Sequence, residues 1–442
     1  MENNLTEKDI EVLNKWAEAY DIDELKIKDK EKIFNLEELS ISEEYIPTEV
    51  FKLTNLKKLH IHYYRNTELP REICNLINLE ELSIECCNLK ELPKEVGNLI
   101  NLEKLYIGCD NLTELSKEIG NLINLEKLNI INCYNLTKLP KEIGNLTNLK
   151  ELRIIYDNCD NFKELPPEEI FNLVNLEYIH IKNNNLMRLS EKIGNLTNLK
   201  EFHIVCDSLI ELPKDMKNLI NLKKLYIGCN NSKELHEEVG NLINLEYLYI
   251  NCYNLTKLPK EIGNLANLKQ FNIVNCENLM ELPKEVGNLI NLEKLNIIDC
   301  YNLTKLPKEI GNLANLKQFN IVNCENLMEL PKEVGNLINL EKFNINCDNL
   351  KQLPKEICNL TNLKELNIKC KNLNKLPNEI CNLNSLEKLT ISSDKLKKIP
   401  KKLGDLPNIK EITIIVKKIK KIPKEIYDKV ELFNVFETYK FE

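Results

Sequence analysis

Residues 267–290 read NLKQFNIVNCENLMELPKEVGNLI, and near copies of this 24-residue segment fill most of the chain. The opening pattern NLxxLxI, with Phe or Ile allowed for the second Leu, occurs seventeen times, mostly 23 or 24 residues apart. The copies start at Asn35, Asn55, Asn78, Asn101, Asn124, Asn148, Asn175, Asn198, Asn221, Asn244, Asn267, Asn291, Asn315, Asn339, Asn362, Ser385 and Asn408. Degenerate copies at 22–27 and 430–435 flank them. A period of this length indicates a solenoid of stacked repeats.

Each part of the repeat predicts a local structure. LxxLxI ends in the alternation expected of a short strand with one buried face. Proline follows, and 14 of the 16 prolines occupy the same (Leu/Ile)-Pro slot, where the strand must already have ended. PKEIxNL then predicts a short helical or 3-10 turn. Ten of the 12 glycines precede Asn-Leu or its equivalent, but Cys74, Phe171 and Lys217 occupy that slot elsewhere, so a positive φ is not required there.

One such unit cannot bury its leucines alone, whereas stacked neighbours can, each adding a strand to a parallel sheet. The pattern LxxLxIxxCxxLxxLP resembles the leucine-rich repeat family, and the likeness covers nearly the whole chain. The variant with LPxxIGNL is similar to repeats of intracellular Ras-group scaffolds and of plant disease-resistance receptors. The resemblance implies an α/β fold: a curved, horseshoe-shaped leucine-rich-repeat solenoid with a parallel β-sheet on the concave face and short helical or 3-10 turns on the convex face.

The ends of the chain differ from the repeats. Residues 6–20 place Ile10, Leu13, Trp16, Ala17 and Tyr20 at helical spacing, and Thr6 three residues before Asp9 predicts a capping box. Such a helix would cover the core of the first repeat, because solenoids need terminal caps; a partner-binding helix is the alternative. We therefore predict an N-terminal cap with a degenerate first strand at 1–34, a repeat array at 35–414, and a degenerate C-terminal repeat and cap at 415–442.

Composition excludes several classes of protein. Apolar residues make up 43% and charged residues 29% of 442, as in a core-forming chain, and no apolar stretch is long enough to span a membrane. The net charge of −8 is too acidic for a general nucleic-acid binder. The polar start MENNLTEKDI predicts no signal peptide, so we expect a cytoplasmic protein with reduced thiols.

The sixteen cysteines mostly share one slot of the repeat. We assign to that slot Cys87, Cys109, Cys133, Cys159, Cys206, Cys229, Cys252, Cys276, Cys300, Cys324, Cys347 and Cys370, with Asn183 filling it once. The family resemblance implies that these side chains face inward and bond backbone groups of neighbouring turns. Cys74, Cys86, Cys358 and Cys381 lie off the slot and are the expected oxidation sites.

Motifs of catalysis and metal binding are missing. The chain has no paired CxxC motifs, HExxH, GxSxG, GxGxxG or P-loop. We therefore predict no enzyme, no metal site and no cofactor.

The fifth position of each LxxLxI should point away from the leucine core, onto the concave face. Between residues 106 and 249 this column concentrates Tyr, His and Arg, which are enriched at binding hot spots, although strands favour Tyr in any case. The predicted binding residues, with two tyrosines from two positions earlier, are Tyr106, Arg153, Tyr178, His180, His203, Tyr226, Tyr247 and Tyr249. From 272 to 367 the column is asparagine, and residues 253–294 recur unchanged at 301–342, so a recent duplication explains much of that run.

These features predict a monomeric, non-enzymatic scaffold that binds a protein or peptide on its concave face, with a role in signal transduction. The alternatives are the ligand-sensing part of an innate-immune-type receptor or host-directed effector, and a structural array that binds nothing. We expect no small-molecule substrate and no nucleic acid as partner. Residues 395–424 hold eleven lysines and two acids, which leaves an acidic partner, nucleic acid or anionic membrane open for that region, against a solvated cap face.

Overall fold

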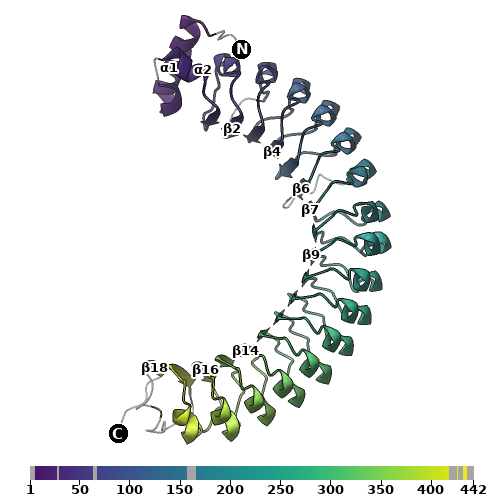
Figure 1. Ribbon diagram of the computed structural model, residues 1–442, viewed down its shortest axis with the longest axis vertical. Helices are drawn as coiled ribbons and strands as arrows, with labels where there is room; N and C mark the ends of the chain where they lie inside the picture. Colours follow the sequence, from purple (N-terminus) through teal and green to yellow (C-terminus); the bar gives the residue numbers. More distant parts are fainter. Residues whose placement is uncertain are drawn as a thin grey trace. The chain divides into compact units, whose positions relative to one another are not determined.

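The computed structural model describes residues 5–26, 29–62, 67–156, 166–417, 426 and the strand 432–435. The chain forms two compact units, unit 1 (Met1–Leu209) and unit 2 (Ile210–Glu442). In each unit, parallel strands line the inner side of a curved stack and short helices line its outer side (Figure 1). The predicted leucine-rich-repeat solenoid with a parallel sheet is therefore confirmed.

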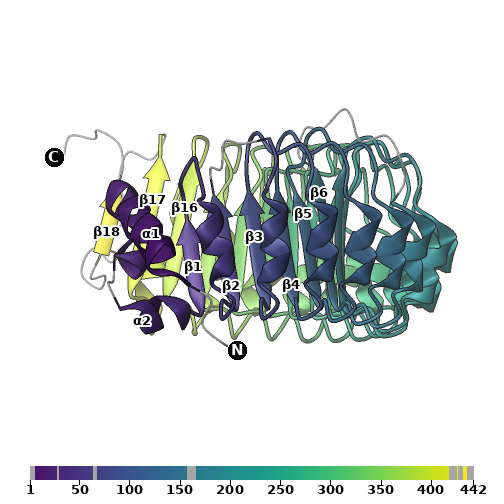
Figure 2. The same ribbon diagram turned by 90° about the horizontal axis from the view of Figure 1, so that it is seen from above.

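Two helices lie at the β1 end of unit 1 (Figures 1 and 2). The first, α1 (Glu7–Tyr20), begins at the predicted capping box, with reciprocal bonds between Thr6 and Asp9. Its apolar face is buried, and the Trp16 indole donates to the Tyr45 carbonyl at 3.0 Å. The second, α2 (Lys30–Phe34), follows a 3-10 turn, η1 (Asp23–Leu25). The domain bounds at 34/35 and 414/415 stay predictions, and much of 415–442 lies outside the described residues.

The strands follow the repeat copies one by one. Unit 1 holds, within the described residues, β1 (Glu38–Ile41), β2 (Lys58–His62), β3 (Glu81–Glu85), β4 (Lys104–Gly108), β5 (Lys127–Ile131), β6 (Glu151–Tyr156), β7 (Tyr178–Asn183) and β8 (Glu201–Val205). Unit 2 holds, in its described part, β9 (Lys224–Gly228), β10 (Tyr247–Asn251), β11 (Gln270–Val274), β12 (Lys294–Ile298), β13 (Gln318–Val322), β14 (Lys342–Asn346), β15 (Glu365–Lys369), β16 (Lys388–Ser393), β17 (Glu411–Val416) and β18 (Leu432–Val435).

The outer segments are 3-10 helices of five residues, most of them preceded by proline. In unit 1 they are η2 to η8, at Thr48–Lys52, Arg71–Asn75, Lys94–Asn98, Lys117–Asn121, Lys141–Asn145, Glu168–Asn172 and Glu191–Asn195. In unit 2 they are η9 to η17, at Lys214–Asn218, Glu237–Asn241, Lys260–Asn264, Lys284–Asn288, Lys308–Asn312, Lys332–Asn336, Lys355–Asn359, Asn378–Asn382 and Lys401–Asp405.

Glycine in these helices serves close packing rather than backbone freedom. No described glycine has a positive φ, as the substitutions in its slot predicted. A Cβ on Gly144 would lie 2.7 Å from both the carbonyl oxygen and the Cβ of Glu169 in the next 3-10 helix. Such a contact is too short for real carbon atoms, so glycine lets successive outer helices approach each other.

Some repeats have an extra residue directly before the cysteine, and this extra residue adopts the left-handed backbone conformation. The four cases are Asn132, Asn275, Asp299 and Asn323, with φ between 51 and 55°. Their short polar side chains tolerate this conformation better than other non-glycine residues do. The backbone N–H of each donates to a carbonyl near the end of the strand in the following repeat, as from Asn132 to Ile155 at 2.8 Å. The insertion therefore leaves the stack unbroken.

Candidate functional site: the inner strand faces and the edge groove

The fifth position of LxxLxI faces away from the core in both units. In β4, Leu105 and Ile107 are at most 1% exposed, whereas Tyr106 between them is partly exposed. Parallel register places this position of every strand beside its equivalent in the next, so the residues form one column within each unit. Alternating burial confirms the inward and outward assignment in strands such as β4, whereas the fifth-position residue is itself buried in β3, β5, β11 and β12.

Column residues are less exposed than a free surface would be. Neighbouring strands lie only about 4.8 Å apart, so their side chains pack against each other. Ser83 and Asn129, on either side of Tyr106, are each 6% exposed. The inner face is therefore a packed layer of side chains that are at most partly exposed to solvent.

Four predicted residues of unit 1 form one group, the Arg–His–Tyr cluster: Arg153, Tyr178, His180 and His203. The Arg153 guanidinium carbon lies 4.8 Å from the centre of the Tyr178 ring, within cation–π range. Arg153 Nε also donates to Glu151 Oε1 at 2.8 Å. These two contacts fix the orientation of the guanidinium.

Aromatic contacts join the remaining members of this cluster. The His203 ring centre lies 5.3 Å from that of Tyr178 and 5.0 Å from that of His180. His203 Nε2 lies 2.7 Å from Glu201 Oε1. Burial raises the pKa of Tyr178, so its phenol keeps its proton and can donate a hydrogen bond.

The three tyrosines of unit 2 form a second group, the tyrosine cluster: Tyr226, Tyr247 and Tyr249. The ring of Tyr226 lies 4.9 Å from that of Tyr247 and 6.0 Å from that of Tyr249, between ring centres. Burial, together with the neighbouring Tyr226, raises the pKa of Tyr247 to about 12. The cluster presents neutral rings with polar tips.

Tyr106 stands apart from the Arg–His–Tyr cluster of its own unit. Its partners in register are Ser83 on β3 and Asn129 on β5, and β5 separates it from Arg153 on β6. The predicted set is thus two clusters, one in each unit, and one isolated tyrosine.

Three asparagines of the unit 2 column, Asn272, Asn296 and Asn320, are joined by hydrogen bonds. Asn272 and Asn296 are 4% and 7% exposed. Asn296 donates its amide to Asn272 Oδ1, and Asn320 donates to Asn296 Oδ1 at 2.6 Å. An amide bonded to its neighbours has less capacity left for a ligand.

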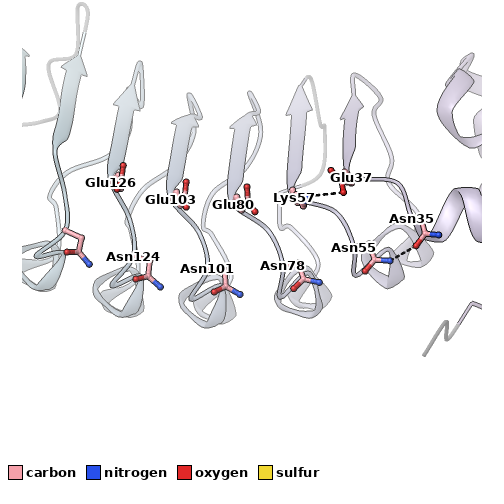
Figure 3. Close-up of a pocket in the computed structure, with 11 residues that line it drawn as sticks. Asn35, Glu37, Asn55, Lys57, Asn78, Glu80, Asn101, Glu103, Asn124 and Glu126 are labelled. Carbon is pink, nitrogen blue, oxygen red and sulfur yellow. Dashed lines mark hydrogen bonds and ion pairs between the residues drawn. The ribbon is translucent and has the colours of Figure 1, made fainter. Parts of the chain in front are cut away.

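A groove at the start of the strands was missed by the sequence reasoning. In unit 1 it encloses about 800 Å³ and is lined by the asparagine that opens each repeat copy and by the second residue of LxxLxI (Figure 3). The asparagines are structural: Asn78, Asn101 and Asn124 each donate to a carbonyl of the preceding repeat at 2.8 Å. The recurrence of this asparagine in every copy except the one that starts at Ser385 was the available signal. The second-position residues are charged, and a smaller groove of about 340 Å³ occupies the same place in unit 2.

The cysteine ladder is present, with one correction. Cys109 donates its thiol to the Ile84 carbonyl at 3.6 Å, one repeat back, and similar bonds extend through unit 2 to Cys370. The sequence assignment of Cys87 to this slot is wrong, because Cys86 is the buried residue and Cys87 is exposed. The strand alternation after Ile84 fixes this register. Cys159 lies outside the described residues.

The cysteines predicted to oxidise also need revision. Cys358 is buried, and burial raises its pKa to about 12, which disfavours the reactive thiolate. Cys74 and Cys381 are partly exposed, as expected. Cys87 joins them as an accessible thiol.

Within the described ranges, no group of three or more His, Cys, Asp or Glu side chains could hold a metal ion. None of the helices in that part of the chain is long and apolar enough to cross a bilayer.

Similarity to known proteins agrees with the geometry. The sequence pattern of the family described as "Leucine-rich repeat region" matches residues 31–164, 225–328 and 322–431. A leucine-rich repeat protein of Leptospira interrogans is 33% identical over 85% of this chain and 94% of its own, with a TM-score of 0.71. A comparison with curated proteins gave no match.

Two proteins of Listeria monocytogenes share the fold at lower identity. The internalin inlF is 20% identical, covering 73% of this chain and 90% of its own, with a TM-score of 0.56. The functional domain of InlJ, described as including a cysteine ladder, is 19% identical, covering 87% and 75%, with a TM-score of 0.53. Proteins of this fold commonly bind proteins or other ligands and are typically not enzymes. The repeats, the sheet and these matches agree that the chain belongs to the leucine-rich repeat family.

Proposed function

We propose that this chain is a non-enzymatic interaction module that binds a protein or peptide on the concave inner faces of its strands. The observation that carries the proposal is the gathering of aromatic and charged side chains, in register, on the side of the sheet away from the leucine core. The Arg–His–Tyr cluster supplies this surface in unit 1 and the tyrosine cluster supplies it in unit 2.

The chemistry of the clusters suits protein recognition. Tyr and Arg dominate binding hot spots because they combine a large contact area with a polar group. Ring contacts and the Arg153–Glu151 bond already restrict these side chains, so less conformational entropy is lost on binding. The cluster of unit 2 would bind apolar and hydrogen-bonding groups, whereas that of unit 1 also offers charge.

We place this module in the cytoplasm, as a scaffold in signal transduction. The fifteen cysteines in the described part of the chain are free thiols, which fits a reducing compartment.

Quantitative affinity purification from the source organism, followed by mass spectrometry, tests the proposal. The double variant Tyr226→Ala/Tyr249→Ala should lose a partner that wild type retains, because each hot-spot truncation costs about 2 kcal/mol, roughly thirtyfold in affinity. Arg153→Ala/His203→Ala tests unit 1 in the same way.

The matched control is Thr390→Ala/Thr413→Ala, in the same column of unit 2 and in register with each other. It should keep the partner. A partner lost equally from the control and both cluster variants, or retained by all three, would refute binding at the clusters. Thermal melting checks that each variant is folded.

A further inference from the structure

The groove of unit 1 lies along a row of charges that ion pairs neutralise only in part. The row consists of the second residue of each LxxLxI: Glu37, Lys57, Glu80, Glu103, Glu126, Lys150, Glu177 and Lys200. The equivalent row of unit 2 alternates strictly: Lys223, Glu246, Lys269, Glu293, Lys317, Glu341, Lys364, Glu387 and Lys410. Alternation places opposite charges on neighbouring strands. Unit 1 breaks it with three consecutive glutamates.

The nearby cations are engaged elsewhere. Lys57 pairs with Glu37 at 2.9 Å, and Lys150 pairs with Glu126 at 2.6 Å. Lys104, the residue after Glu103, pairs with Glu81 at 3.1 Å. Glu80 and Glu103 are exposed and have no ion pair among the described residues, although they line the groove (Figure 3). Lys57 attracts Glu80, and Lys104 and Lys150 attract Glu103, only from beyond ion-pair distance. Two adjacent carboxylates therefore face solvent without a cation in direct contact.

The same three repeats also expose a row of isoleucines. Ile77, Ile100 and Ile123 are 45%, 55% and 55% exposed, and each directly precedes an asparagine of the groove. The carbonyls of Ile77 and Ile100 accept hydrogen bonds from Asn101 and Asn124, which fixes their backbone beside the groove. The flanking repeats carry Thr54 and Thr147 at this position. An exposed apolar row thus coincides over these three repeats with three glutamates, of which only Glu126 has an ion pair.

We propose that this edge of unit 1 binds a basic amphipathic α-helix lying along the repeats. Its Lys or Arg side chains would face Glu80, Glu103 and Glu126, and its apolar side chains would cover Ile77, Ile100 and Ile123. Charge complementarity selects the partner, because an acidic or purely apolar helix would leave the carboxylates unpaired in a covered groove. This surface is separate from the inner faces and does not depend on binding there.

Spacing favours a helix over a strand as the bound element. Adjacent parallel strands lie about 4.8 Å apart, so corresponding residues of three repeats span roughly 10 Å. Basic residues one helical turn apart repeat every 5.4 Å or so, and three of them span about 11 Å, which is two turns. Alternate residues of an extended strand repeat every ~6.7 Å and would span ~13 Å. The helix therefore matches the spacing of the three glutamates more closely than the strand does.

The probe for the test is a synthetic helical peptide of about five turns, roughly 18 residues, with lysine at every third or fourth position beside a leucine stripe. Its binding to the full chain is measured by fluorescence anisotropy. Glu103→Lys restores the alternation found in unit 2 and should weaken binding at least about tenfold, because it places like charges together. Ile100→Ser should also weaken binding. Affinity for the wild type should fall as salt is added.

Each variant has a matched control in unit 2. Glu329→Lys makes the same charge change at an exposed acid away from the row, and Ile338→Ser removes an isoleucine that is 55% exposed. Both should change affinity less than about twofold, within the ±0.5 kcal/mol expected for surface changes. If Glu329→Lys weakens binding as much as Glu103→Lys, the attraction is general and the proposal fails. It also fails if a proline-containing peptide of the same composition, unable to form a helix, binds equally well.

Discussion

Unit 1 and unit 2 have the same kind of core but differ on two surfaces, the inner face and the strand edge. In both, the core consists of buried leucines, the isoleucines that end LxxLxI and the ladder cysteines. Beyond its tyrosine cluster, unit 2 is regular, with hydrogen-bonded asparagines on the inner face from β11 to β13 and alternating ion pairs at the strand edge. Unit 1 carries Arg, His and Tyr on the inner face and unpaired glutamates at the edge. Because the fold tolerates both, the irregular residues are not required by packing and are free to serve recognition.

The largest effect should appear where the two units are alike. Gly144→Ala in unit 1 and Gly263→Ala in unit 2 should each cost about 3 kcal/mol of unfolding free energy, the upper end for overpacking. The added Cβ would meet the carbonyl oxygen of Glu169 at 2.7 Å or of Glu285 at 2.5 Å, and a backbone atom cannot rotate away. Urea denaturation measures both changes.

Gly108→Ala is the control, because its Cβ would lie 3.4 Å from the nearest atom, in ordinary contact. It should be neutral or stabilising, since glycine weakens a strand. A destabilisation equal to that of Gly144→Ala would show that these losses have another cause than close packing.

The next largest difference in unfolding free energy should come from substitutions on the inner faces of the two units. Asn296→Ala should cost about 1–2 kcal/mol, because it removes amide bonds to Asn272 and Asn320 in a nearly closed environment. Tyr106→Ala, at the same column position in unit 1, should cost less than about 1 kcal/mol because it opens no core cavity. Chemical denaturation of both variants provides the comparison. Equal losses would mean that the two columns do not differ in structural role.

The smallest effect concerns the charge rows. Lys317→Glu in unit 2 breaks the pair with Glu293 at 2.9 Å and creates three consecutive glutamates, as in unit 1. It should cost about 0.5–1 kcal/mol at low salt, and added salt should reduce the loss. Glu103→Lys should stabilise unit 1 by a few tenths of a kcal/mol under the same conditions. Thermal melts at two salt concentrations measure both, and opposite signs are required.

The sequence predicted the fold closely because every repeat restates the same pattern. Alternating burial in LxxLxI fixed the register, and the capping box at Thr6 fixed the start of α1. It failed at Cys86 and Cys87, where two adjacent cysteines fit the slot and only the strand register distinguishes them. The sequence prediction also treated the eight binding residues as a single site. Tyr106 is isolated because contacts across a parallel sheet depend on which strands are neighbours.

By itself, the sequence determined the solenoid, the buried face of each strand and the place of the 3-10 helices, because these follow from local periodicity and from the need to bury leucine. Only the tertiary structure decided which side chains meet. The groove of unit 1 contains residues about 23 positions apart, and its unpaired glutamates become a surface feature only when stacking brings Glu80 and Glu103 to neighbouring strands. The role of glycine is similar: no positive φ requires it, and the carbonyl of the next repeat, which a Cβ would strike, is near only in the stacked chain.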